Sequence, residues 1–171
     1  MMPPLIAATL TDAEAIAELR NRVADDMTRR HGRGAWSGRC TDKGVLFDLR
    51  HAVVCLARIR GRAVASLKLA IRKPWAIDRS FFTPVDRPLY LTAMVVTPDL
   101  QRQGLGRHCL EEAARLARRL PADAIFLDAF DHPTAGAGEF YRKCGFRETG
   151  RSSFRQVPLR YFELLLGGDS A

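Results

Sequence analysis

The 171-residue chain lacks the marks of membrane, secreted and repetitive proteins. Its longest apolar runs, such as residues 52–57, are far shorter than the ~18 residues that a membrane-spanning helix needs. The start of the chain, residues 1–5, has no positive charge ahead of an apolar core, as a secretory signal requires. We therefore expect a cytoplasmic protein with no membrane partner.

Cysteine is scarce, and its spacing fits neither a disulfide framework nor a zinc site. The four cysteines, Cys40, Cys55, Cys109 and Cys144, form no Cys-x-x-Cys pair, and the four histidines do not cluster with them. Cys55 and Cys109 fall in segments of apolar periodicity, where a cysteine usually serves as a small buried residue. We therefore expect no metal cofactor.

The signatures of two common nucleotide sites are also missing. No Gly-Lys-Ser or Gly-Lys-Thr triplet occurs, so the chain has no ATP-type phosphate loop. Gly104 and Gly106 are not followed by the third glycine of a dinucleotide-binding loop. The turn that contains Gly104 and Gly106 therefore belongs to neither of these two classes of nucleotide site.

Positive charge is in excess, because Lys and Arg number 27 and Asp and Glu 19, for a net charge of +8. A basic surface attracts nucleic acid, but it equally suits a small cofactor that carries several phosphates. The arginines are dispersed apart from short groups such as Arg29-Arg30, so nucleic acid is the less favoured partner. An apolar fraction of 47% is ordinary for a globular chain, and the length predicts a single domain over residues 1–171.

Hydrophobic periodicity and turn residues predict an α+β fold with a largely antiparallel sheet. A capping box at residues 11–14 predicts the start of a first helix. Loops are expected at residues 31–39 and 72–88. The other expected helices cover residues 41–49, 105–120 and 135–144, and the expected strands cover residues 5–9, 52–59, 62–71, 89–96, 124–130, 146–150 and 157–166.

The strand 89–96, the glycine-bearing segment 101–106 and the helix that follows together predict an anion site. The N–H groups at a helix start have no intrahelical acceptor, and the helix dipole favours negative charge there. Gly104 and Gly106 remove side chains where a phosphate has to approach the backbone. For the glycines alone, a turn that merely joins a strand to a helix is the alternative.

Two motifs resemble the signatures of the GNAT superfamily of N-acetyltransferases. The pattern Gln/Arg-x-x-Gly-x-Gly/Ala, after a strand that ends in Met94-Val95-Val96, resembles the pyrophosphate loop that binds acyl-CoA in this family. Residues 139–146 resemble the second signature, a helix that ends in Tyr-x-x-x-Gly-Phe. The resemblance covers residues 89–146 and implies a GNAT-like mixed, largely antiparallel central sheet with helices on both faces, in three α/β/α layers.

The resemblance assigns roles to particular residues. Met94, Val95 and Val96 match the strand whose backbone binds the pantetheine arm. Thr134 takes the place of an asparagine that touches CoA in many members, and Ala137 matches a small residue one helical turn before Tyr141. The residues that match the pyrophosphate loop are Gln101, Arg102, Gln103, Gly104, Leu105, Gly106 and Arg107.

The resemblance implies direct transfer of an acetyl group from acetyl-CoA to a primary amine of a small molecule or a protein, in a ternary complex. Tyr141, with an unperturbed pKa of about 10, would protonate the departing thiolate as general acid. A backbone N–H of the 89–96 strand would stabilise the oxyanion. A non-catalytic acyl-CoA sensor and an enzyme that acetylates aminoacyl-tRNA stay open as alternatives, as does a homodimer.

A general base is not evident from the sequence. Many family members carry a glutamate on the strand that matches 89–96, but residues 91–94 offer no carboxylate here. Asp128, Asp131 and His132 are the nearest alternatives. A water chain, or an acceptor that arrives as a neutral amine, is equally open, so no base is assigned.

Gly136 and Gly138 are unusual in the helix expected over residues 135–144. Each costs about 1 kcal/mol relative to alanine in a helix interior. A close approach of the cofactor or the backbone would explain them, and so would a frayed first helical turn.

Overall fold

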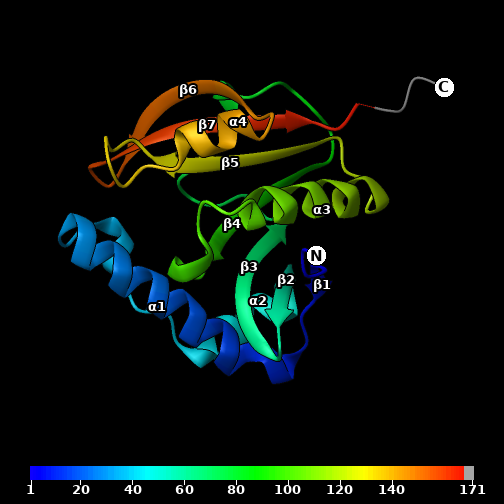
Figure 1. Cartoon of the computed structure of the whole chain (residues 1–171). Coiled ribbons are helices and arrows are strands. Elements are labelled where there is room, and N and C mark those ends of the chain that lie inside the picture. Colours follow the sequence, from blue (N-terminus) through cyan, green and yellow to red (C-terminus); the bar gives the residue numbers. More distant parts are fainter. Residues whose placement is uncertain (168–171) are drawn as a thin grey trace. The chain divides into compact units, whose positions relative to one another are not determined.

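The structure, a computed structural model, describes residues 1–167 (Figure 1). Its strands are β1 (Ile6–Ala7), β2 (Val53–Ile59), β3 (Arg62–Ala70), β4 (Pro88–Val96), β5 (Ala124–Phe130), β6 (Arg147–Phe154) and β7 (Val157–Leu165). Its α-helices are α1 (Ala13–His31), α2 (Asp42–His51), α3 (Leu105–Arg119) and α4 (Gly138–Lys143). This succession confirms the expected α+β fold, and the strands form a seven-stranded mixed sheet in the order β1-β2-β3-β4-β5-β7-β6.

The chain divides into two compact units. Unit 1 comprises residues 1–70 and 93–113, and unit 2 comprises residues 71–92 and 114–171, so β4 and α3 contribute to both. A single domain over residues 1–171 stays a prediction. Within residues 1–167, no helix is long and apolar enough to cross a membrane.

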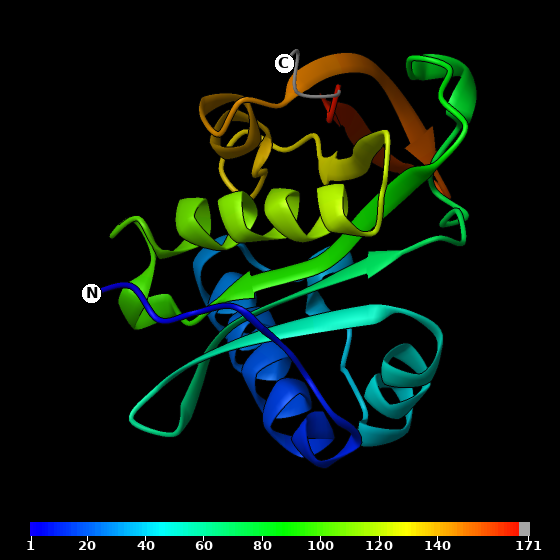
Figure 2. The ribbon, with the colours of Figure 1, turned by 90° about the vertical axis from the view of Figure 1, so that its right-hand side faces the viewer.

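In unit 1, strands β1, β2 and β3 pair antiparallel, with Ile6 opposite Leu56. β2 and β3 form the expected hairpin, and its turn residues Arg60 and Gly61 have φ angles of 50° and 78°. Helix α1 packs against both β3 and α2 (Figure 2). The buried core of this unit contains Ile16, Leu19, Val23, Val45, Val54 and Leu56.

Two of the cysteines are buried in unit 1, as their sequence context predicts. Cys55 lies on β2 and Cys109 on α3, and each is 1% exposed. Burial raises the pKa of both thiols to about 11, so they stay protonated and unreactive at neutral pH. Cys40 and Cys144 are partly exposed.

The start of α1 differs from the sequence prediction. The capping box expected at residues 11–14 is wrong in position, because the Thr9 N–H donates to Asp12 Oδ2 at 2.8 Å. Asp12 also accepts from Arg58 at 2.7 Å. The contact with Thr9, and then that with Arg58, lowers the pKa of Asp12. A carboxylate tied to β2 therefore closes a 3₁₀ turn, η1 (Leu10–Asp12), before α1 begins.

Unit 2 holds the parallel part of the sheet. β4 and β5 pair in parallel over residues 88–90 and 124–126. β7 pairs antiparallel with both β5 and β6, and Asp128 on β5 lies opposite Tyr161 on β7. The buried core of this unit contains Ile77, Phe82, Tyr90, Ala124, Phe126 and Tyr161.

The segment between β3 and β4, expected as a loop, is fixed to the sheet of unit 2. Glu163 on β7 is 1% exposed, and its oxygens accept from the Thr83 N–H at 2.9 Å and the Thr83 hydroxyl at 2.7 Å. Arg147 on β6 pairs with the same carboxylate. The hydroxyl of Tyr161 donates to Ala76 O at 2.5 Å. This segment is therefore held to the sheet of unit 2 at Ala76 and at Thr83.

Removing the Thr83 hydroxyl should destabilise this connection. Thr83→Val keeps the shape of the side chain but takes one donor from the buried Glu163 carboxylate, so we expect the free energy of unfolding to fall by about 1–3 kcal/mol. Thr92→Val is the matched control, because within residues 1–167 the buried Thr92 hydroxyl has no hydrogen-bond partner and its loss should be neutral or stabilising. Denaturant unfolding measures both. Equal losses in the two variants would contradict the role assigned to Thr83.

Candidate functional site

The predicted anion site lies in unit 1, where the turn after β4 leads into α3. The His108 N–H donates to Gly104 O at 3.0 Å and begins the helical hydrogen bonds. The amides of Gly104, Leu105 and Gly106 precede that bond, as the amides of a helix start do. Gly104 has a φ of 89°, so the entry into α3 needs the conformational freedom of glycine.

Residues that the sequence patterns do not reveal fix this turn. Arg62 on β3 donates to both carboxylate oxygens of Asp99, at 3.0 and 2.8 Å. It also donates to Thr97 Oγ1 at 2.9 Å, and the Thr97 hydroxyl donates to Asp99 Oδ1 at 2.7 Å. Arg62, followed by Thr97, holds the pKa of the Asp99 carboxyl well below its usual range. A bidentate pair of this kind holds the turn in one geometry.

The predicted loop residues divide into two groups. Gln101 Nε2 donates to Val96 O at 3.0 Å and Gln103 Nε2 donates to Asp99 O at 3.0 Å, so both amides hold the turn itself. Arg102 and Arg107 are exposed, and Arg102 has a φ of 60°. The guanidinium groups, rather than the glutamine amides, are therefore the loop side chains that an anion can reach.

The second half of β4 carries the predicted pantetheine-binding residues. Ala93 lies within the strand with a φ of 51° and is exposed, whereas Met94, Val95 and Val96 are partly buried. Val95 packs against the core of unit 1. Because its side chain is committed to that core, only its backbone groups are available to a ligand.

Helix α4 in unit 2 carries Tyr141. It begins at Gly138, later than the expected residue 135, and ends at Lys143, and Gly145, whose φ is 94°, closes it as predicted. The Phe146 N–H donates to Tyr141 O and the Gly145 N–H to Arg142 O, each at 3.1 Å. These two bonds form a Schellman cap, which closes the helix directly after the tyrosine.

Tyr141 and Asp128 are close enough to influence each other electrostatically. The Tyr141 side chain is mostly buried, and its ring centroid lies 6.1 Å from that of Phe162. Burial, and next the negative charge of Asp128, raises the pKa of Tyr141. Burial also raises the pKa of Asp128 on β5. Both groups therefore hold their protons more firmly than they would in water.

The other two residues considered as a base have contacts elsewhere in unit 2. Asp131 forms an ion pair with Arg151 at 3.6 Å. His132 Nδ1 accepts from the Thr134 N–H at 3.2 Å and from the Ala135 N–H at 2.9 Å. Within residues 1–167, no three His, Cys, Asp or Glu side chains gather where they could hold a metal ion.

The turn before α4 explains Gly136. Its N–H donates to His132 O at 3.1 Å, and an added Cβ would lie 2.5 Å from Phe130 O and 2.7 Å from His132 O. Ala137, predicted near the cofactor, follows with a φ of −100° and accepts from the Tyr141 N–H at 3.1 Å. A close approach of the backbone therefore accounts for Gly136.

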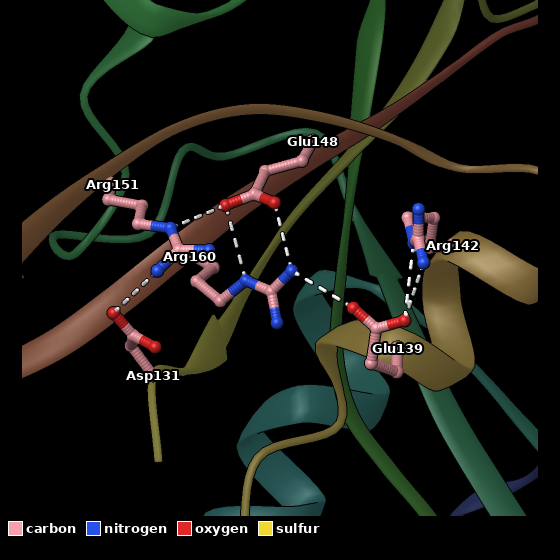
Figure 3. A network of polar contacts seen from close by, with 6 residues as sticks. All are labelled: Asp131, Glu139, Arg142, Glu148, Arg151 and Arg160. Carbon is pink, nitrogen blue, oxygen red and sulfur yellow. Dashed lines mark hydrogen bonds and ion pairs between the residues drawn. The ribbon is translucent and has the colours of Figure 1, made fainter. Parts of the chain in front are cut away.

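A network of charged side chains explains Gly138. An added Cβ there would overlap Arg160 Nη1. Arg160 on β7 donates to Glu148 at 3.2 and 2.8 Å and reaches Glu139 on α4 at 3.5 Å. Arg160 is also the main cause that lowers the pKa of Glu148 to about 2. The remaining members of this network are Asp131, Arg142 and Arg151 (Figure 3).

Unit 1 thus carries a glycine turn at the start of α3, and unit 2 carries the buried Tyr141 on α4 and Asp128 on β5. Comparison with protein families identifies the family of this chain. The model of the acetyltransferase (GNAT) family matches residues 16–146, so the chain belongs to that family. No curated protein matches the chain significantly in sequence.

Solved structures share the fold over nearly the whole chain. The ribosomal-protein-S18-alanine N-acetyltransferase of Escherichia coli matches with a TM-score of 0.72 at 18% identity, over 99% of both chains. A Salmonella typhimurium protein, solved with its cofactor acetyl-CoA, matches with a TM-score of 0.71 at 18% identity, over 100% of this chain and 98% of that one. An N-acetyltransferase of Thermoplasma acidophilum in complex with coenzyme A gives 0.69 at 12% identity, over 94% and 98%. The expected GNAT fold is confirmed.

The packing of Arg160 against Gly138 gives a testable consequence. Gly138→Ala places a methyl group on the guanidinium, so we expect a loss of about 1–3 kcal/mol in the free energy of unfolding. Gly44→Ala in α2 is the matched control, because the new Cβ meets only Thr41 Oγ1 at 3.4 Å. That variant should gain up to about 1 kcal/mol.

The pH dependence of stability shows whether Gly138→Ala acts by disturbing the Arg160–Glu148 contact. The stabilisation from Glu148 is fully present above its ordinary pKa of 4.5 and is lost as the pH falls toward its folded pKa of about 2. The stability gap between the wild type and Gly138→Ala should therefore narrow between those two pH values. A gap that stays constant over this window would show that the methyl group acts without disturbing the Arg160–Glu148 contact.

Proposed function

We propose that this N-acetyltransferase moves an acetyl group from acetyl-CoA to a primary amine of a small molecule or a protein. The observation that carries the proposal is the start of α3, where amides outside the helical bonding and the exposed Arg102 and Arg107 follow β4. Such a helix start favours a pyrophosphate. Structures of the same fold that hold acetyl-CoA or coenzyme A support the choice of donor.

The donor would bind along residues of unit 1 in a definite order. Its pyrophosphate would contact the 101–107 turn, and its pantetheine arm would bond to the backbone of residues 94–96. The Arg62–Asp99 pair supports this assignment, because it fixes the turn before any ligand arrives. A preformed turn spares the ordering cost that a flexible loop would pay on binding.

The chemistry needs a group that stabilises the departing thiolate, and we assign it to Tyr141. Its raised pKa keeps the hydroxyl protonated at neutral pH, so the hydroxyl is available as a donor. A free thiol has a pKa of about 8.5, below that of this phenol, so full transfer of the proton to the thiolate is uphill. The hydroxyl therefore acts by donating a hydrogen bond to the sulfur, which stabilises the negative charge as the C–S bond breaks.

We assign acceptance of the amine proton to Asp128. Burial raises the pKa of Asp128, so its carboxylate is a stronger base than that of an exposed aspartate. Asp131 and His132 are less suited, because Arg151 holds the first and two backbone amides use the ring nitrogen of the second. The proton of the attacking amine would pass to Asp128, directly or through one water.

The donor site predicts the effect of ligand on stability. Acetyl-CoA should stabilise the wild type by about 2.7 kcal/mol at a hundredfold excess over its Kd. Gly104→Val should abolish this shift, because a branched residue is strained at a φ of 89° and fills the space that a phosphate needs. Gly38→Val is the control, since a Cβ at Gly38 meets nothing within 4 Å.

Thermal unfolding with and without acetyl-CoA measures the shift for each variant, and the unliganded melting curve shows whether Gly104→Val is folded. Arg102→Gln supplies a second variant that leaves the glycine turn intact and should weaken binding through the lost charge. Normal binding by both variants would place the pyrophosphate elsewhere.

The assigned acid and base should differ in their pH profiles. Tyr141→Phe should lower turnover by about 10²-fold or more at every pH while the affinity for acetyl-CoA is kept. In the wild type, turnover should rise with pH through the raised pKa of Asp128 and then level off. Asp128→Asn should remove that plateau, so that the rate follows the fraction of free amine up to the pKa of the acceptor.

Turnover on a panel of amines, followed from acid to alkaline pH, makes this measurement. Tyr161→Phe is the control for the loss of a buried hydroxyl, because its bond to Ala76 O is structural and turnover should be kept. An unchanged pH profile in Asp128→Asn would show that Asp128 is not the base. The amine would then lose its proton to solvent or arrive already neutral.

A further inference from the structure

We propose that His132 is a positioning residue for acetyl transfer, because its imidazole sets the turn from which Tyr141 and Thr134 are presented. The proposal rests on the proposed function, which assigns the chemistry to Tyr141. His132 would not touch the reacting atoms. It would act through the backbone of residues 132–137.

The geometry around the ring shows how the turn is held. Nδ1 of His132 accepts from the Thr134 N–H at 3.2 Å and from the Ala135 N–H at 2.9 Å, and the Thr134 hydroxyl lies 3.4 Å away. The Gly136 N–H bonds to the backbone carbonyl of the same histidine at 3.1 Å. Three successive amides therefore end on one residue. An imidazole nitrogen that accepts N–H groups carries no proton, so the ring is the tautomer with hydrogen on Nε2.

Backbone hydrogen bonds connect this turn to β7 at one end and to Tyr141 at the other. At its start, the Asp131 N–H donates to Pro158 O on β7 at 2.9 Å, and at its end Ala137 O accepts from the Tyr141 N–H at 3.1 Å. Within the turn, the space at Gly136 is closed by carbonyl oxygens. Helix α4 has only six residues, too few to keep a position without outside contacts. A shift of the turn would therefore move the tyrosine with it.

The bonding pattern is that of an Asx turn, with histidine in place of asparagine. Nδ1 of histidine and Oδ1 of asparagine are both attached to Cγ, so both reach the amides two and three residues further on. The residue after His132 is Pro133, which commonly follows the first residue of such turns. Asparagine should therefore reproduce the cap, whereas glutamine carries its oxygen one bond too far.

Three substitutions separate the cap from mere packing. His132→Asn keeps the acceptor at the right distance, His132→Phe keeps a ring without an acceptor, and His132→Gln keeps an amide with the wrong reach. His51→Phe is the control, because His51 lies in α2 of unit 1, where its Nδ1 bonds to Phe47 O at 2.8 Å. Each variant is measured by amide hydrogen exchange of Thr134 and Ala135, by acetyl-CoA affinity and by turnover.

We expect His132→Phe and His132→Gln to exchange these two amides at least about tenfold faster and to lose about tenfold or more in turnover, with His132→Asn close to the wild type in both. Equal turnover in the Asn and Phe variants would overturn the positioning role. Unchanged exchange in His132→Phe would overturn the cap itself. The exchange result needs no acceptor amine, so it stands apart from the acid role, whose failure would appear as full turnover in Tyr141→Phe.

Discussion

Helix α4 depends on contacts outside itself, since its six residues are too few to stay helical or in place alone. Its first residue has no side chain because the Arg160 guanidinium occupies that space, and its last turn is closed by the bonds around Gly145. The aromatic rings of Phe146 and Phe162 then enclose Tyr141. The hydroxyl proposed to act in catalysis is thus held by its neighbours.

Arginine has different uses in the two units. In unit 2, Arg151 and Arg160 form ion pairs with the nearby carboxylates of Asp131 and Glu148 (Figure 3). In unit 1, Arg62 forms an ion pair with Asp99 in the turn after β4, whereas Arg102 in the same turn is exposed. Part of the excess positive charge of the sequence therefore lies at the turn proposed to bind an anionic donor, which a count of residues cannot reveal.

Local signals predicted the elements well, because hairpin turns and helix ends depend on neighbours in the chain. The turn at Arg60-Gly61 and the helix end at Gly145 are of this kind. Features that depend on distant residues could not be predicted. The helix cap forms at Asp12, whose carboxylate also binds the distant Arg58. The absence of a side chain at Gly138 is explained only by Arg160, which comes later in the chain. For the same reason, sequence alone could not choose among Asp128, Asp131 and His132.

The unequal burial of the cysteines bears on how the enzyme can be assayed. Cys55 and Cys109, with pKa values raised to about 11, will not consume a reagent that titrates free thiols. Cys40 and Cys144 are within reach of such a reagent, and Cys144 follows Tyr141 by one helical turn. A chromogenic readout of released CoA would therefore carry a background from the protein and modify it beside the tyrosine. Following the acetylated amine by mass spectrometry avoids both effects.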